Sequence, residues 1–136
     1  VCSSDLVDLL PAAGSQVYAR VRAKQHQAAI RLWIPDYFDA HSNASAFAYN
    51  DGKSSTVAGL NGWQIPQLNQ QTLAALAEAD PAKRRALYTA MQQELQRSSP
   101  YVFIDQAKTE VVLRDNVKGY QQGLNADMVY YDRVSK

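Results

Sequence analysis

The dipeptide Asp80-Pro81 constrains the fold most, because it fixes where a long helix begins. Asp is a preferred helix N-cap, and Pro is favoured at the first helical position, where its missing N–H has no partner. Small and apolar side chains then recur about every 3.6 residues, which predicts a helix over 81–98 that ends before Pro100. The predicted apolar stripe consists of Ala86, Leu87, Ala90, Met91, Glu94 and Leu95, and the predicted solvated face of Arg84, Arg85, Gln92, Gln93 and Gln96.

The first 34 residues predict a strand, a helix and a second strand. The apolar run 7–10 is closed by Pro11, Ser15 is an N-cap candidate for a helix over 16–24, and 28–34 is a second apolar run. A βαβ unit of this kind pairs its strands in parallel with a right-handed crossover. Ligand sites in open parallel sheets lie beyond the carboxyl ends of the strands. Asp36 follows the second strand, at such an end.

The rest of the chain predicts one more helix and several short strands. Residues 40–62 are rich in Ser, Asn, Gly and Ala and contain the turn signal Asn50-Asp51-Gly52, so a long loop is expected. A helix is predicted over 67–79, after Ile65-Pro66. Strands are predicted at 101–104, 110–114 and 128–131. The predicted fold class is therefore α/β, with helices on a mixed sheet.

Length and charge limit the function classes. The chain has 136 residues, enough for one domain at most, with 14 basic and 13 acidic residues. A net charge of +1 argues against nucleic acid as a partner, which requires a clustered basic excess. The single cysteine, Cys2, excludes an internal disulfide. Residues 1–6 are interpreted as a non-native leader, because they translate a nucleotide string that resembles the end of a sequencing adapter.

The stretch around Asp36 is the candidate ligand site. A short apolar run is broken by Pro35 and continues into a loop in which Trp33 and Tyr37 flank the carboxylate. Aromatic faces that exclude water and one directed charge are typical of a ligand pocket. The alternative is structural: the two rings belong to the core, and Asp36 and Asp39 cap a turn.

The spacing Trp33-x-x-Asp36-Tyr37-x-Asp39 resembles the W-x-x-D-Y-x-D-P signature of extracellular solute-binding proteins of the oligopeptide and dipeptide type, the receptors of ABC importers. Ala40 stands where the family usually has Pro. Three later stretches, in the same order as in the family, resemble its D-P-x-x-R-x-x-L-Y helix start, its following strand and its V-x-G-Y motif; they are residues 80–88, 99–104 and 117–120.

The resemblance implies a C-terminal fragment of a two-lobe receptor. Residues 7–104 would form an incomplete C-terminal lobe of the periplasmic-binding-protein fold, and 105–136 the return through the hinge and a segment of the other lobe. The receptor would be a periplasmic or lipid-anchored extracellular monomer when full length. It would bind a small peptide or similar solute, without catalysis or cofactor, and deliver it to permease subunits in the membrane.

The resemblance also assigns the ligand contacts. In the peptide-binding relatives, the aspartate at the position of Asp36 pairs with the α-ammonium of the peptide. Trp33 and Tyr37 would form pocket walls, and backbone groups around Ile34 and Pro35 would bond an extended peptide in strand fashion, although Pro35 has no N–H to donate.

An enzymatic alternative stays open. Asp36, Asp39 and His41 lie within six residues and could support a metal-assisted hydrolase, although their spacing matches no recognised metal site. Ser42 or Ser45 could also act as a nucleophile with His41 as base, but no G-x-S-x-G elbow surrounds either serine.

Overall fold

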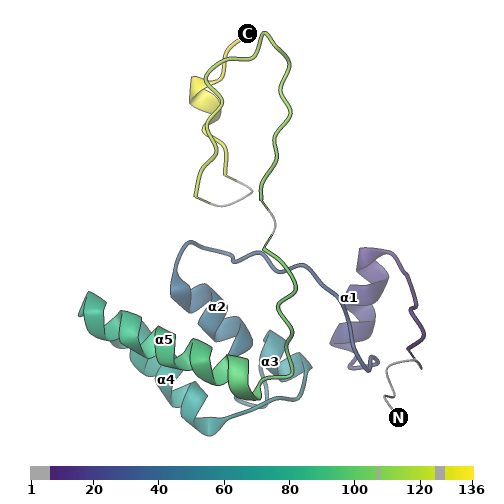
Figure 1. The fold of residues 1–136 in the computed structure, drawn as a ribbon, viewed down its shortest axis with the longest axis vertical. Helices are drawn as coiled ribbons and strands as arrows, with labels where there is room; N and C mark the ends of the chain where they lie inside the picture. The colour runs from purple at the N-terminus through teal and green to yellow at the C-terminus, as the bar shows by residue number, and fades with distance from the viewer. Residues whose placement is uncertain (1–6, 107, 125–127) are drawn as a thin grey trace. The chain divides into compact units, whose positions relative to one another are not determined.

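The computed structural model describes residues 7–106, 108–124 and 128–136 (Figure 1). The predicted leader and Cys2 lie outside these residues. The chain divides into two compact units, Val1–Arg31 and Leu32–Lys136. The helices are α1 Gly14–Arg22, α2 Ala40–Phe47, α3 Val57–Leu60, α4 Pro66–Ala77, α5 Pro81–Ser98 and the 3₁₀ helix η2 Tyr131–Arg133. Among the described residues, no helix is both long and apolar enough to span a bilayer.

The expected α/β fold, with a βαβ unit and helices on a mixed sheet, is wrong. The structure is 43% helical with only 3% strand, and its described residues contain no sheet. The runs 7–10, 28–34, 101–104 and 110–114 are not strands, and 128–131 contributes a single bridge, Gln122 to Val129. An apolar run becomes a strand only where a neighbouring strand accepts its backbone hydrogen bonds, and these runs have no such neighbour. The argument that Asp36 follows a parallel strand is lost with the sheet.

The long helix that begins at Asp80-Pro81 is confirmed as α5. The Oδ1 atom of Asp80 accepts hydrogen bonds from the backbone N–H groups of Ala82 and Lys83, both at 2.9 Å. The predicted helix over 67–79 is also confirmed, as α4, which starts one residue earlier at Pro66 and ends at Ala77. Local capping and periodicity therefore located both long helices.

The core of the second unit lies between α2, α4 and α5. Its α2 side is built from alanines, which allow close approach to the larger side chains of α4 and α5. Phe47, Trp63 and Tyr101 are partly buried and pack against this core. The buried residues are Ala44, Ala48, Leu68, Ala75, Tyr88, Met91 and Leu95.

The expected long loop at 40–62 contains α2 and α3, so that prediction is wrong in part. The turn at Asn50-Asp51-Gly52 is confirmed, and Gly52 has a φ of +79°. Asn50 is buried, and its side chain accepts a hydrogen bond from the Gly52 amide and donates one to the Trp63 carbonyl, both at 2.8 Å. Its backbone amide donates to Asn69 on α4 at 2.8 Å. One asparagine thus ties the turn to the helix that follows.

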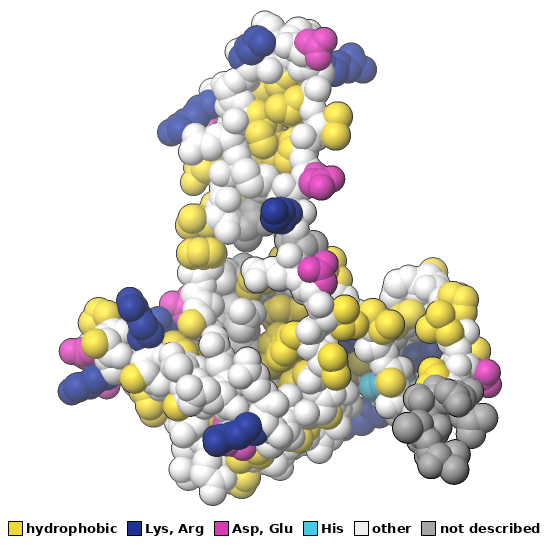
Figure 2. Space-filling view, viewed as in Figure 1, with side chains coloured by type: hydrophobic (Ala, Val, Ile, Leu, Met, Phe, Trp, Pro, Cys, Tyr) yellow, Lys and Arg dark blue, Asp and Glu magenta, His cyan; other side chains and the backbone are white. Residues whose placement is uncertain are grey.

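The C-terminal residues form an open hairpin held by two antiparallel bridges, Lys118 to Ser135 and Gln122 to Val129. Gly119 lies in the left-handed region with a φ of +72°. A Cβ atom there would lie 1.8 Å from the carbonyl oxygen of Arg133, so the close approach of the two arms requires glycine. This contact gives the V-x-G-Y stretch a structural reason. Figure 2 shows hydrophobic side chains on the visible surface of this C-terminal part.

The first unit contains α1, which confirms the predicted helix with both ends two residues earlier; Ser15 lies inside it, so its prediction as the N-cap is wrong. Its N-cap is Ala13, and no side chain caps the helix. The Tyr18 ring lies 4.6 Å from the guanidinium carbon of Arg22 and 4.8 Å from that of Arg31. These cation–π contacts hold the residues after α1 against the helix.

Replacing Leu68 tests the position of the core. Leu68 is 1% exposed and Leu73, on the same helix, is 54% exposed. We expect Leu68→Ala to lower the free energy of unfolding by about 2–5 kcal/mol, because it removes buried apolar contacts and leaves a cavity. Leu73→Ala should cost much less. Urea denaturation followed by circular dichroism measures both, and equal losses would contradict this core.

Candidate functional site

The segment from Trp33 to Asp39 is attached to the first turns of α2. The indole Nε1 of Trp33 donates a hydrogen bond to Oδ1 of Asn43 at 2.9 Å. The backbone amide of Asp36 donates to Oγ of Ser42 at 3.2 Å. Asp39 ends the segment as the N-cap of α2. The residues proposed to contact a ligand are therefore positioned by a helix rather than by a sheet.

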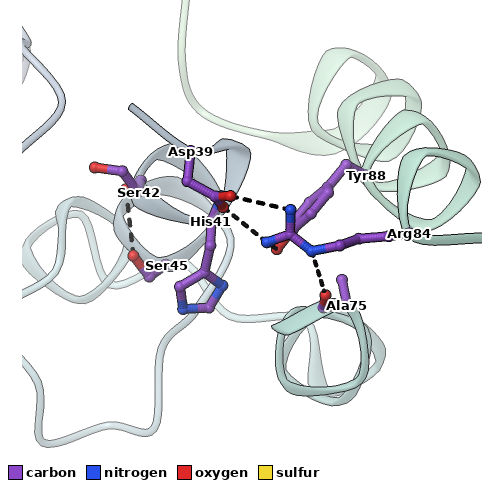
Figure 3. Close-up of polar contacts among 7 residues, drawn as sticks. All are labelled: Asp39, His41, Ser42, Ser45, Ala75, Arg84 and Tyr88. Carbon is purple, nitrogen blue, oxygen red and sulfur yellow. Dashed lines mark hydrogen bonds and ion pairs between the residues drawn. The ribbon is translucent and has the colours of Figure 1, made fainter. Parts of the chain in front are cut away.

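Asp39 carries two structural roles at once. Its Oδ1 accepts a hydrogen bond from the backbone amide of His41 at 2.7 Å, which caps α2. The same carboxylate forms a bidentate ion pair with Arg84 of α5, with Nη2 to Oδ1 at 2.7 Å and Nη1 to Oδ2 at 3.0 Å. Figure 3 shows the guanidinium pointing at this carboxylate. Two parallel bonds fix the orientation of the cap as well as its charge.

Arg84 also connects the ion pair to the core. Its Nε donates to the carbonyl of Ala75 at 3.1 Å, one of the last four carbonyls of α4, which have no partner within the helix. Its Nη2 donates to the hydroxyl of Tyr88 at 3.2 Å. The prediction that Arg84 belongs to the solvated face of α5 is therefore wrong. One side chain joins the start of α2, the end of α4 and the body of α5.

These hydrogen bonds, together with the burial of Tyr88, shift the pKa values of three side chains. The hydrogen bonds from Arg84 hold the pKa of the Asp39 carboxyl below its usual value, and the amide of His41 lowers this pKa further. The bond to Asp39 raises the pKa of Arg84, and burial raises the pKa of the Tyr88 hydroxyl. Asp39 is thus ionised and already paired, which leaves it no charge to offer a solute.

Asp36 differs from Asp39 both in its exposure and in the absence of a described partner for its carboxylate. Its side chain is exposed, and its carboxylate has no hydrogen-bond or ion-pair partner among the described residues. Trp33 is 38% exposed and Tyr37 47%, and Ile34 is exposed to a similar degree. Pro35 is partly buried. The five residues assigned to ligand binding stay a prediction, and they form a continuous segment with one unpaired negative charge.

Trp33 combines the two roles that its sequence position left open. Its ring meets Phe47 edge to face, with the centroids 5.2 Å apart. Phe47 contacts Tyr101 in the same way at 5.4 Å, and Tyr101 contacts Trp63 at 5.8 Å. The tryptophan therefore ends a chain of aromatic contacts that leads into the core, while part of its ring stays exposed.

The arrangement does not support the hydrolase alternative. Asp39 is held by Arg84, and within the described part of the chain no three His, Cys, Asp or Glu side chains form a group that could hold a metal ion. Nδ1 of His41 is buried without a partner. Oγ of Ser45 donates to the carbonyl of Ser42 at 3.2 Å, and Oγ of Ser42 accepts from Asp36, so His41 pairs with neither serine.

Sequence reasoning missed α2 and the role of Arg84, although signals for both were present. Asp39 is a good N-cap residue, and Ala44 and Ala48 after it have helical spacing. Arg84 lies four residues before Tyr88, on the same face of α5. Nothing local indicated that a partner for Arg84 stood 45 positions earlier in the chain.

The pH dependence of stability tests the Asp39–Arg84 pair. A carboxyl whose pKa is lowered by folding adds stability above its unfolded pKa, near 3.8, and loses it as the pH falls through the lowered value. We expect the stability difference between wild type and Asp39→Asn to be constant from pH 7 to about 5 and to shrink below about 4. Asn also caps helices, so this difference isolates the charge.

Thermal unfolding from pH 7 to 2.5 measures this difference. The comparison with Asp39→Asn is needed because hydrogen bonds also lower the pKa of Asp51 and Glu94, which adds to acid unfolding of both proteins. Glu110→Gln is the control: its carboxylate has no described partner, so it should alter the melting point at pH 7 less than Asp39→Asn. A difference that persists unchanged at pH 2.5 would contradict the pair.

Comparison with known proteins adds no assignment. No protein-family model matches the chain, and neither the curated proteins nor the solved structures contain a match to it. The resemblance to solute-binding proteins therefore rests on the four short stretches of sequence alone.

Proposed function

We propose that this chain is part of the solute-binding component of an ABC importer and that Asp36 binds the positive charge of a small peptide or similar solute. The observation that carries the proposal is the exposed, unpaired carboxylate of Asp36 beside Trp33 and Tyr37. A receptor for a free amine requires such a charge, because an ammonium that leaves water needs a counter-charge.

Contacts between the stretches that carry the family resemblance support the proposal. Asp39 of the first stretch is paired with Arg84 of the second, and Arg84 bonds Tyr88, the last residue of that stretch. Tyr101 of the third stretch joins Trp33 of the first through Phe47. The first stretch thus contacts the second directly and the third, 68 positions along the chain from Trp33 to Tyr101, through Phe47, so three of the four stretches pack around one core.

The mechanism that we propose is capture without chemistry. The carboxylate of Asp36 would pair with the ammonium of the solute, while the rings of Trp33 and Tyr37 would cover its apolar part. A second lobe would supply the other half of the pocket and close over the solute through a hinge. The closed receptor would then dock on permease subunits, in the periplasm or while anchored to a membrane by lipid.

Replacing Asp36 in the full-length receptor tests the assignment. We expect Asp36→Ala to weaken binding of free-amine tripeptides by at least about tenfold, because it removes the counter-charge of the ammonium. Asp105→Ala is the matched control, because Asp105 is also exposed and has no described partner. Isothermal titration calorimetry measures both, and equal affinities for wild type and Asp36→Ala would refute the role of Asp36.

A second measurement separates a receptor from a hydrolase. The full-length protein is heated with a mixture of tripeptides and with the same mixture after N-acetylation. A receptor that recognises the amine is stabilised by the first mixture and much less by the second, and it leaves the peptides intact. Consumption of the peptides would favour hydrolysis. The upstream coding sequence gives an independent check, since the proposal expects it to encode an export signal followed by a further lobe.

A further inference from the structure

We infer that Arg84 is a positioning residue for the solute site, holding the Asp36 segment in place through its ion pair with Asp39. The inference rests on the proposed function for its purpose, because only a bound solute makes the position of Asp36 matter. Its structural content, that one side chain of α5 orders a segment 45 residues earlier in the chain, can be tested without any solute.

The path from Arg84 to Asp36 is short and made of directional bonds. The carboxylate of Asp39 pairs with the guanidinium of Arg84 and caps α2. The backbone amide of Asp39 donates a hydrogen bond to the carbonyl of Tyr37 at 2.9 Å. Ser42, in the first turn of that capped helix, accepts the amide of Asp36. The backbone of Asp36 is therefore bonded to a helix whose starting point is set by Asp39.

Arg84 can set this starting point because its guanidinium is planar and makes four hydrogen bonds. Nη1 and Nη2 bind the two oxygens of Asp39, Nε binds Ala75, and the guanidinium carbon lies 5.0 Å from the centroid of the Tyr88 ring. Ala75 and Tyr88 are core residues, so the core fixes the plane of the guanidinium. A lysine would keep the charge but could not make these bonds in one plane.

A positioning role differs from a general contribution to stability. Arg84 bonds two core residues, Ala75 and Tyr88, whereas Leu68, Met91 and Leu95 are buried in the same core and make no described hydrogen bond to the ion pair. Loss of the guanidinium should therefore leave α4 and α5 packed. The segment before α2 should lose order, because its remaining contacts with α2 are two single hydrogen bonds, the Asp39 cap and the edge contact of Trp33 with Phe47, all at exposed or partly buried sites.

The test compares Arg84→Lys with Arg85→Lys, its exposed neighbour on α5. Backbone order parameters from ¹⁵N relaxation report the order of each amide. In Arg84→Lys we expect the values for the amides of Asp36 and Tyr37 to fall from about 0.85 to below about 0.6, while that of Met91 stays near 0.85. Arg85→Lys should change none of them. Asp39→Asn, which retains a capping side chain, should reproduce the loss seen in Arg84→Lys.

Two outcomes would overturn the inference. One is unchanged order at Asp36 in Arg84→Lys and in Asp39→Asn, and the other is an equal loss of order at Met91, which would make Arg84 a general stabiliser. Tripeptide affinity of the full-length receptor separates this inference from the proposed function. If Asp36→Ala binds as wild type does while Arg84→Lys still disorders the segment, the proposed function fails and the positioning role stands.

Discussion

The bidentate contact between Asp39 and Arg84 is the interaction on which the arrangement of α2, α4 and α5 depends. Both side chains remain about one-third exposed, so the pair cannot be credited with much stability. Its effect is geometric: it sets the rotation of α2 against α5, and the bond from Arg84 to Ala75 adds the end of α4. Burial of apolar side chains in the core stabilises the packing of these helices, and the ion pair fixes how they are oriented against one another.

The sequence predicted what local chemistry decides. Asp80-Pro81 located α5 because an N-cap and a proline act within one turn, and helical spacing located α4. The strand predictions at 28–34 and 101–104 were wrong because β-structure requires a partner that no local pattern specifies. Arg84 was placed in solvent for a related reason, since its position on α5 is visible in the sequence and its distant partner is not. The sequence predictions were therefore wrong mainly where the structure depends on a contact between residues that are far apart in the chain.

Two aspartates of one short stretch have opposite roles, and their surroundings account for the difference. Asp39 is the N-cap of α2 and forms an ion pair with Arg84, so its negative charge is already balanced within the protein. Asp36 lies three residues earlier on an exposed turn and has no partner in the described structure. The sequence supported a ligand role for Asp36 and left a capping role open to both residues. A carboxylate already satisfied by its own protein has little to gain from a solute, so this division of roles favours Asp36 as the binding residue.

The extended residues after α5 show how the helical core and the proposed receptor are related. Residues 102–106 and 108–114 are exposed, and Val112, at 96%, is almost fully so. Among the described residues, the only backbone hydrogen bond of these stretches is the one that the Arg114 carbonyl accepts from Val117, and exposed apolar side chains on such a backbone have the properties of an uncovered sheet edge. In the proposed receptor, these apolar residues would be covered by the second lobe. The helices need no such partner, because α2, α4 and α5 bury one another and bond within themselves. The same division separates the sequence predictions that succeeded from those that failed: the helices satisfy their own backbone hydrogen bonds, whereas each predicted strand needed a partner that the described residues do not supply.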